Sequence, residues 1–243
     1  MSEHYTRTAV VTGGSRGLGR ALTSELSSRG WRVVIDGRDA AVLTAAVADL
    51  AHPDRVTAIA GDIADPIHRS ALVEAAGPRV DLLVNNASAL GTVPLPSLTD
   101  YPLDDLEYAF AVNTVAPLRL VQLLRPALEH AALHGVTARV VNVSSDAAAL
   151  AYPGWGGYGA SKAALDLISA VLGVELPHLR VYAFDPGDMG TDLAAAAGED
   201  PADRPAPETV VPAVLRLAEA DLPSGRYSAA ELAAELVMDG AGR

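Results

Sequence analysis

A strand, a glycine-rich turn and a helix follow one another near the N-terminus, and this order restricts the fold more than any other feature. Residues 8–12 are β-branched and apolar, which predicts a short strand buried on both faces. Residues 13–19 read Gly-Gly-Ser-Arg-Gly-Leu-Gly, and a helical pattern occupies 20–29. Glycines let the backbone approach a pyrophosphate, and a helix N-terminus offers free N–H groups and a positive dipole end. A dinucleotide-binding turn is therefore predicted rather than an ordinary tight turn.

Strand-like and helix-like segments continue to alternate along the chain. Strands are expected at 32–36, 56–59, 80–84, 140–143, 180–184 and, more weakly, 226–229. Helices are expected at 40–50, 66–76, 103–133, 160–176 and 209–220, with Pro117 and Pro126 able to bend or break the long one. No repeat or linker divides the sequence. We predict an α/β protein with one Rossmann-type domain over 1–243, a doubly wound parallel sheet with helices on both faces.

Composition excludes several classes of function. The net charge of −12 and the lack of a Lys/Arg-rich run are unfavourable for nucleic-acid binding. The chain has no cysteine, so neither disulfides nor a thiolate site are expected, and no metal site is predicted. No apolar run reaches the ~20 residues of a membrane span, and residues 1–7 show no signal peptide. We expect a soluble, cytoplasmic protein without a membrane or nucleic-acid partner.

The only lysine of the chain, Lys162, follows Tyr158 by one helical turn, whereas the remaining cationic side chains are all arginine. A free phenol has a pKa near ~10. A cation at ~4 Å, in an effective dielectric of ~20, favours the phenolate by roughly 4 kcal/mol. Tyr158 is therefore a candidate general acid or base. Taken alone, however, such a pair is more often an i,i+4 contact on a surface helix. Ser144 and Ser145 stand at the end of the 140–143 strand, where ligands bind in open α/β sheets.

The end of the second strand leaves two interpretations of the adenosine ribose site. An acidic group there binds the 2′-hydroxyl of NAD, whereas arginine accommodates the 2′-phosphate of NADP. Asp36 and Arg38 are both candidates, and Arg16 in the glycine-rich turn could supply a second cation. Asn85 and Asn86 follow the fourth strand, where asparagine side chains can hold an irregular turn beside a ligand.

Six motifs in this order resemble the classical short-chain dehydrogenases/reductases. They are Thr12-Gly13-x-x-x-Gly17-x-Gly19, Asn85-Asn86-Ala87, Asn113, Ser145, Tyr158-x-x-x-Lys162 and Pro186-Gly187-x-x-x-Thr191, and the resemblance covers about residues 8–191. It implies that Tyr158 exchanges a proton with a carbonyl or alcohol oxygen and that Ser145 hydrogen-bonds this oxygen. By the same resemblance, Lys162 binds the nicotinamide ribose and lowers the pKa of the phenol, and Asn113 holds a water. Ser144 is expected to be structural.

The resemblance also implies a cofactor-binding set around the glycine-rich turn. Asp62 would bind the adenine edge, Asn86 the adenosine side and Thr191 the carboxamide. The full set is Gly13, Ser15, Arg16, Gly17, Leu18, Gly19, Arg38, Asp62, Ile63, Asn86, Ala87, Tyr158, Lys162, Pro186, Gly187 and Thr191. The acidic position of NAD-preferring relatives falls on Gly37, and the basic positions of NADP-preferring relatives fall on Arg38 and Arg16. NADP(H) is therefore the predicted cofactor, with NAD(H) as the alternative.

Two departures from the family pattern stand out. Ser88 replaces the glycine that usually follows Asn-Asn-Ala, although function is expected to survive this change. The C-terminal tail from Pro223 lacks the ending typical of tetrameric members, so a homodimer and a homotetramer both remain open. The family's usual interface uses the helices that begin near Leu103 and Tyr158.

The leading functional hypothesis is a ketone reductase or secondary alcohol dehydrogenase. Segments 90–98, 150–155 and 187–197 are expected to line the substrate site, and 191–207 is expected to form a lid. Their apolar side chains suit an uncharged, partly hydrophobic substrate: Leu95, Leu150, Tyr152, Trp155, Met189 and Leu193. The alternatives are an NAD-dependent alcohol dehydrogenase, a dehydratase or cyclase on the same scaffold, and a nucleotide-sensing binding protein.

Overall fold

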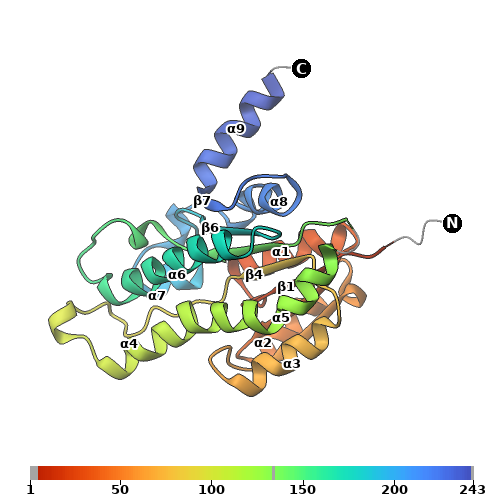
Figure 1. Cartoon of the computed structure of the whole chain (residues 1–243). Coiled ribbons are helices and arrows are strands. Elements are labelled where there is room, and N and C mark those ends of the chain that lie inside the picture. Colours follow the sequence, from red (N-terminus) through yellow and green to blue (C-terminus); the bar gives the residue numbers. More distant parts are fainter. Residues whose placement is uncertain (1–4, 133–134, 242–243) are drawn as a thin grey trace.

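The computed structural model describes residues 5–132 and 135–241, with side chains described as far as Glu235 in the last helix. Its centre is a sheet of parallel strands in the order β3-β2-β1-β4-β5-β6-β7 (Figure 1). The strands are β1 (Thr8–Val11), β2 (Arg32–Gly37), β3 (Val56–Ala60), β4 (Leu82–Asn85), β5 (Arg139–Val143), β6 (Arg180–Asp185) and β7 (Gly225–Ser228). The predicted α/β class and parallel sheet are confirmed.

Helices cover both faces of the sheet. One layer contains α1 (Gly17–Ser28), α2 (Ala40–Ala48) and α8 (Val211–Glu219), and the other contains α3 (Pro66–Ala76), α5 (Ala116–Ala132) and α6 (Gly156–Glu175). Strand β1 shows why its sequence is apolar throughout. Ala9 and Val11 pack in the first layer's core, whereas Val10 packs in the second. A strand buried on both faces needs hydrophobic residues at every position.

The stretch expected as one helix over 103–133 consists of three pieces. Helix α4 (Leu103–Phe110) leads into a π-helical turn, Ala111–Val115, which is followed by α5. Neither proline causes the break, because Pro117 lies in the first turn of α5 and Pro126 within it. π-Turns inside helices are frequent at functional sites, and Asn113 lies in this one. Leu133, the last residue of the expected helix, lies outside the described residues. So do residues 1–4 of the segment 1–7 in which no signal peptide was expected.

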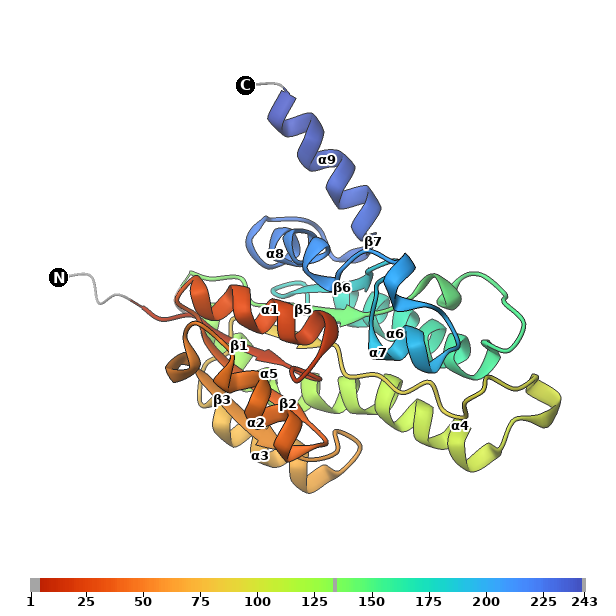
Figure 2. The same cartoon turned by 180° about the vertical axis from the view of Figure 1, so that it is seen from behind.

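The C-terminal helix α9 (Ala229–Ala241) was not predicted, and it projects from the body of the molecule (Figures 1 and 2). A capping box begins it, because Glu231 N donates to Ser228 Oγ at 3.2 Å and Ser228 N donates to Glu231 Oε2 at 2.8 Å. The Ser-x-x-Glu spacing that makes this box is a readable helix-start signal. Leu232 of this helix is buried in the core, and Ala229 packs against it.

Candidate active site

The glycine-rich turn follows β1 and lies against the turn after β4, at the point where the strand order reverses. Gly13 has φ of 69°, and a Cβ added there would lie 3.0 Å from Ala87 Cα. Thr12 Oγ1 accepts hydrogen bonds from the backbone of Asn86 at 3.0 Å and Ala87 at 2.9 Å. The Asn86 side chain donates to Thr12 O at 2.9 Å. Asn86 therefore holds the two turns together, as expected of an asparagine at this position.

Helix α1 starts at Gly17, three residues before the predicted start, so that the later glycines belong to its first turn. Arg16 occupies the N-cap position, and no side chain caps the helix. A Cβ on Gly19 would collide with Gly13 O, so no side chain fits at position 19 in the first turn of α1. Open N–H groups at a helix N-terminus beside bare glycine backbone fit the pyrophosphate of a dinucleotide.

The Asp36 carboxylate is 2% exposed and is occupied on both oxygens. Gly13 N donates to Oδ1 at 2.6 Å, and His68 Nε2 lies 3.0 Å from Oδ2. Asp36 therefore supports the glycine-rich turn from below and does not face outward like a ribose-binding residue. His68 was not singled out from the sequence, because a lone histidine on α3 carries no spacing signal.

Arg38, in contrast, is exposed just after β2 and begins a series of hydrogen bonds between side chains. Its Nη1 donates to the Tyr108 hydroxyl at 3.3 Å, and this hydroxyl donates to Asp62 Oδ2 at 2.8 Å. Asp62 Oδ1 accepts from Ala64 N at 2.8 Å, while Ile63 beside it is buried. The structure thus brings Arg38 and Asp62 together through Tyr108 of α4, a residue without any motif that could have identified it.

Asn113 is fully buried in the π-helical turn. Its Oδ1 accepts from Ala89 N at 2.8 Å and Ser88 Oγ at 3.2 Å, and its Nδ2 donates to Ala89 O at 2.8 Å and Ser161 Oγ at 2.9 Å. The amide thereby connects the turn after β4 to α6. Its water-holding role stays a prediction. Ser88 supplies a hydroxyl that a glycine at its position lacks.

Tyr158 and Lys162 lie in α6, which begins at Gly156. Tyr158 is 6% exposed and stands edge-on to Trp155, with ring centroids 5.6 Å apart. Burial raises the pKa of its phenol to about 12, whereas hydrogen bonds from Ser88 and Ser145 lower it and the charges of Asp185 and Asp146 raise it. The expected lowering of this pKa is not found, because desolvation outweighs the other influences.

Lys162 is 1% exposed, and its Nζ donates to Val143 O at 2.7 Å and lies 5.6 Å from the Tyr158 ring centroid. Burial lowers the pKa of its ammonium to about 8, although the charge of Asp166 raises it. Burial therefore disfavours the charged forms of both the phenol and the ammonium. The prediction assumed a cation at about 4 Å from the phenol and neglected this common cost.

Ser145 stands at the carboxyl end of β5, close to the phenol. Its Oγ donates to Asp146 Oδ1 at 3.0 Å and accepts from Ala147 N at 3.2 Å. Asp146 also accepts from the Tyr152 hydroxyl at 2.8 Å. The Ser145 hydroxyl must therefore turn from Asp146 when it donates to a substrate oxygen. Ser144 is buried at 2% exposure, and its Oγ has no hydrogen-bond partner among the described residues, so its structural role stays a prediction.

The segment after β6 folds over the glycine-rich turn. Thr191 caps α7 (Asp192–Ala196) through a 3.3 Å bond from Ala194 N, and its Cγ2 lies 3.4 Å from where a Cβ on Gly17 would be. Asp192 pairs with Arg16 at 2.6 Å. A cavity of about 1010 Å³ borders these residues and α8. Pro186 is buried, and Gly187 has φ of 69°.

Apolar side chains gather beside Tyr158. Leu95, Trp155 and Leu193 pack with the cluster that Tyr158 forms with Leu90 and Ala147. Leu150 and Tyr152, in contrast, are exposed, at 55% and 42%. Met189 packs against the core under α1 and α8, so its expected place in the substrate site is not supported.

Comparison with known proteins identifies the family. The model of the short chain dehydrogenase family matches residues 7–202. The chain belongs to the short-chain dehydrogenase family. The 3-oxoacyl-(acyl-carrier-protein) reductase of rhamnolipids biosynthesis from Pseudomonas aeruginosa is 32% identical over 243 residues, covering 97% of this chain and 89% of the relative. L-xylulose reductase from Bos taurus is 34% identical over 197 residues, covering 80% and 77%.

Solved structures agree with this assignment. A short-chain dehydrogenase from Escherichia coli, crystallised with NADPH, superposes with a TM-score of 0.79 at 26% identity, covering 92% of this chain and 96% of the other. As a short-chain dehydrogenase, the protein is an oxidoreductase. Within residues 5–132 and 135–241, no helix has the length and apolarity to cross a bilayer. The described side chains also form no cluster of three or more potential metal ligands of the His, Asp and Glu type.

Proposed function

We propose that this short-chain dehydrogenase is an NADP(H)-dependent carbonyl reductase or secondary alcohol dehydrogenase, with Tyr158 as its acid/base. The observation that carries this proposal is the convergence of four elements on one phenol. Ser145 after β5 and Ser88 after β4 lie close enough to the phenol to lower its pKa, Lys162 lies below its ring, and Asn113 from the π-turn bonds Ser88. A pure binding protein has no need of this arrangement.

The residues fit the proposed reaction. The bound nicotinamide supplies or accepts the hydride. Tyr158 gives its proton to the carbonyl oxygen during reduction and takes it back during oxidation. Ser145 releases Asp146 and donates to the same oxygen, so that two donors stabilise the developing negative charge. Lys162 holds its ammonium beneath the phenol, where a positive charge favours the phenolate that reduction leaves behind.

Preference for NADP(H) is supported by the ribose end of the site. Asp36, the acidic alternative, is buried and already bonded to Gly13 and His68. Arg38 and Arg16 are exposed around the mouth of the same turn, and Gly37 carries no acidic side chain between them. A 2′-phosphate would meet two guanidinium groups here, whereas a 2′-hydroxyl would find no free carboxylate among these residues.

The substrate we propose is an uncharged carbonyl compound with an apolar substituent. Leu95, Trp155 and Leu193 surround the phenol, and they come from the loop after β4, the start of α6 and α7. Because Leu193 belongs to 191–207, this segment is proposed as the lid of a single catalytic domain. Reductases that act on 3-oxoacyl and sugar ketones are among its relatives, which supports a ketone rather than an acid.

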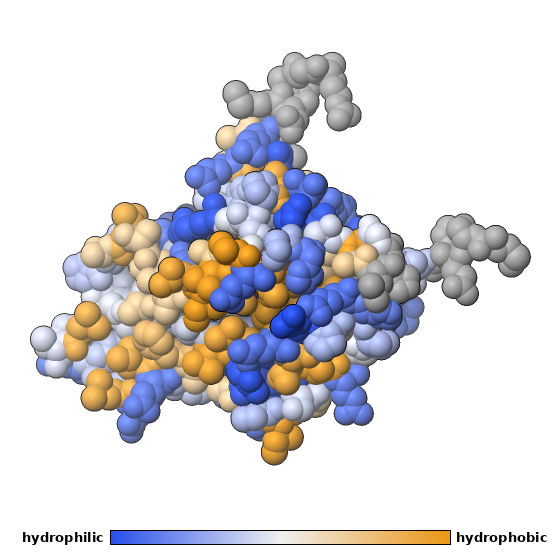
Figure 3. All heavy atoms as spheres, viewed as in Figure 1, coloured by the Kyte–Doolittle hydropathy of each residue, from blue (hydrophilic) through white to orange (hydrophobic). Residues whose placement is uncertain are grey.

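We also propose a cytoplasmic homo-oligomer that associates through α4, α5 and α6. Three apolar residues spaced along α6 are exposed: Leu167 at 69%, Val171 at 45% and Val174 at 81%. Leu103 on α4 is 68% exposed. Figure 3, seen from the side of these helices, shows apolar surface spread over this face. Apolar patches of this kind mark protein interfaces.

The proposal is tested by substrate turnover with two variants. The purified protein is assayed for NADPH oxidation with acetophenone, diacetyl and ethyl acetoacetate. Tyr158→Phe should abolish turnover of the best of these ketones and leave NADPH binding unchanged, whereas Tyr182→Phe serves as a matched control because Tyr182 lies in the core away from the site. Substantial activity in Tyr158→Phe, or no redox change with any ketone or the corresponding alcohols, would refute the proposal.

A further inference from the structure

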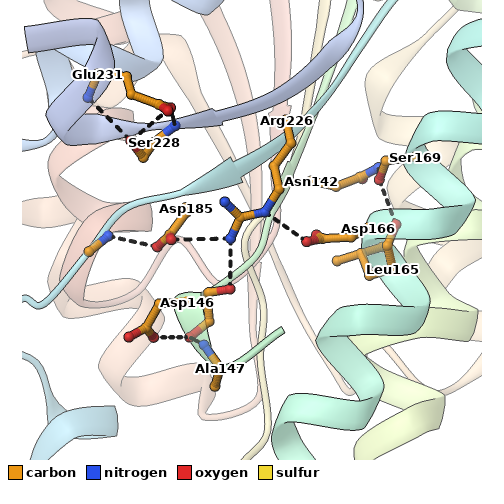
Figure 4. Close-up of polar contacts among 12 residues, drawn as sticks. Asn142, Asp146, Ala147, Leu165, Asp166, Ser169, Asp185, Arg226, Ser228 and Glu231 are labelled. Carbon is orange, nitrogen blue, oxygen red and sulfur yellow. Dashed lines mark hydrogen bonds and ion pairs between the residues drawn. The ribbon is translucent and has the colours of Figure 1, made fainter. Parts of the chain in front are cut away.

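One guanidinium ties together three parts of the active site. Arg226 lies on β7 and reaches the carboxyl ends of the neighbouring strands (Figure 4). Its Nε donates to Asp166 Oδ2 at 3.0 Å, and its Nη2 donates to Asp185 Oδ2 at 3.2 Å and to the backbone oxygen of Ser145 at 3.1 Å. β6 and β7 pair with Ala183 opposite Arg226, which brings the side chain to this edge of the sheet.

Each partner of Arg226 belongs to a segment that the reaction uses. Ser145 is the proposed donor to the substrate oxygen. Asp185 accepts from Gly187 N at 3.0 Å through its second oxygen, so it shapes the turn that begins at Pro186. Asp166 lies one helical turn beyond Lys162 on α6. A single side chain therefore connects the ends of β5 and β6 with the helix that carries the phenol.

The contact is not an ordinary surface salt bridge. Exposed pairs are commonly worth little because solvent screens them. Here the side chains of Asp166 and Asp185 are only 18% and 11% exposed, whereas that of Arg226 is 38% exposed. Loss of the guanidinium would leave two largely buried carboxylates without their cation, a situation that is strongly unfavourable.

The charges around the phenol give Arg226 a second consequence. Asp185 and Asp146 are the carboxylates whose charges raise the pKa of Tyr158, and Asp166 raises that of Lys162. Arg226 pairs with two of these three. Glu231 at the start of α9 is a further charged group that interacts with Arg226, and its pKa is lowered chiefly by hydrogen bonds from Ser228 and less by Arg226. Neutralising Asp185 therefore depends on Arg226.

We propose that Arg226 is a positioning residue for the reaction: it fixes the Ser145 backbone against the Asp185–Gly187 turn and balances the charge of Asp185 beside the catalytic phenol. This inference rests on the proposed roles of Tyr158 and Ser145. It extends them to a strand at the sheet edge, outside every motif of the sequence.

The test separates charge from geometry with four single variants and the double variant Arg226→Met/Asp185→Asn. Arg226→Met removes both the charge and the hydrogen bonds, whereas Arg226→Lys keeps the charge but loses the planar guanidinium that bonds three partners. Asp185→Asn removes the opposing charge but keeps an acceptor for Gly187 N. Arg180→Met is the matched control, because it removes a guanidinium of β6 that pairs with Asp221 at 2.9 Å instead of with the carboxylates of the active site. The pH dependence of kcat/KM is measured for oxidation of the alcohol that corresponds to the best ketone of the panel, together with the Kd for NADPH.

Oxidation requires the phenolate, so its rate rises with pH. We call this rising part of the pH–rate profile the pH limb. In Arg226→Met the pH limb should move to higher pH by about half a unit, which lowers the rate roughly threefold at a fixed pH on the limb. It should move to lower pH in Asp185→Asn and return toward the wild-type position in Arg226→Met/Asp185→Asn. Arg226→Lys should restore the limb but not the full kcat, while the Kd for NADPH stays within about twofold throughout.

A merely structural role would lower thermal stability without moving the pH limb. An unshifted limb in folded Arg226→Met, or in Asp185→Asn if the first variant does not fold, overturns the inference. A wild-type kcat in Arg226→Lys would show that the guanidinium is not needed to fix the Ser145 backbone against the Asp185–Gly187 turn. Tyr158→Phe, measured in parallel, distinguishes failure of the proposed function from failure of the role of Arg226. If Tyr158→Phe retains activity, the assignment of the active site is wrong and this inference fails with it. If Tyr158→Phe is inactive and the pH limb of the Arg226 variant is unmoved, only the role proposed for Arg226 is wrong.

Discussion

Replacement of Arg38 by alanine is the sharpest test of cofactor choice. Arg38 is exposed at the end of β2 and donates to the Tyr108 hydroxyl at 3.3 Å. A 2′-phosphate at this place would draw the guanidinium into a charge-assisted hydrogen bond, and NADH offers no such group. Arg38→Ala should therefore weaken NADPH much more than NADH.

The size of the effect follows from the contacts that Arg38 exchanges. A hydrogen bond to a charged group is worth about 1.5–3 kcal/mol, and the bond to Tyr108 that is given up is worth about 0.5–1.5 kcal/mol. The net loss is about 1–2 kcal/mol, or roughly 5–30-fold in the Kd for NADPH. NADH should change by about threefold at most, since only neutral contacts are lost.

Arg16 should contribute less than Arg38. Its guanidinium is paired with Asp192 at 2.6 Å, and this pair must open before Arg16 can bind a phosphate. Arg16→Ala should therefore cost less in NADPH affinity, and Asp192→Asn should improve that affinity. Because all these groups are exposed, the preference for NADPH should also shrink as salt is added.

Fluorescence titration of both cofactors measures the four dissociation constants in wild type and variant. Asp36→Asn is the internal control: it disturbs the support of Gly13, so it should weaken NADPH and NADH by a similar factor. Equal losses of the two cofactors in Arg38→Ala would refute the assignment of Arg38 to the 2′-phosphate. A loss confined to NADH in Asp36→Asn would show that Asp36 reads the ribose after all.

Three further predictions address the phenol, the lysine and the interface. Ser88→Gly removes a hydroxyl that lowers the Tyr158 pKa, so the pH limb of alcohol oxidation should move upward while Kd for NADPH is unchanged; an unmoved limb would show that Ser88 does not contact the phenol. Lys162→Met should abolish turnover yet raise Tm at pH 7. The unfolded chain binds the Lys162 proton up to about pH 10.5 and the folded protein only to about 8, so stability rises with pH in that window; a lower Tm in the variant would contradict this. Val174→Glu should shift the sedimentation coefficient toward the monomer, whereas Ile67→Glu, on the exposed start of α3, should not.

The order of strands and helices was predictable because each segment carries its own pattern. Residues 66–76 read as a helix and form α3 with the same bounds, and the apolar run after Arg7 forms β1. The positions of Ser145 and Tyr158 follow from the same logic, since the carboxyl ends of parallel strands meet at one edge. These properties depend on local composition and on the rules of parallel sheets.

The features that were missed depend on contacts between distant segments. The π-turn at Asn113 has no breaker residue to announce it, because Pro117 fits into the first turn of α5. Tyr108 reaches Asp62, 46 residues away, and Arg226 reaches Ser145, 81 residues away. Neither spacing could be read from the chain, because only the sheet order places β7 beside β6 and two strands from β5.

Burial explains why charge balance matters so much at this site. Desolvation raises the pKa of Tyr158 to about 12 and lowers that of Lys162 to about 8, so burial works against the charged pair that the helix spacing suggested. Activity near neutral pH must then come from what surrounds them. Hydrogen bonds from Ser88 and Ser145 lower the phenol pKa, and Arg226 offsets the carboxylate that opposes them. The family motif marks the proposed proton donor, but the residues that influence its pKa lie on other strands and loops.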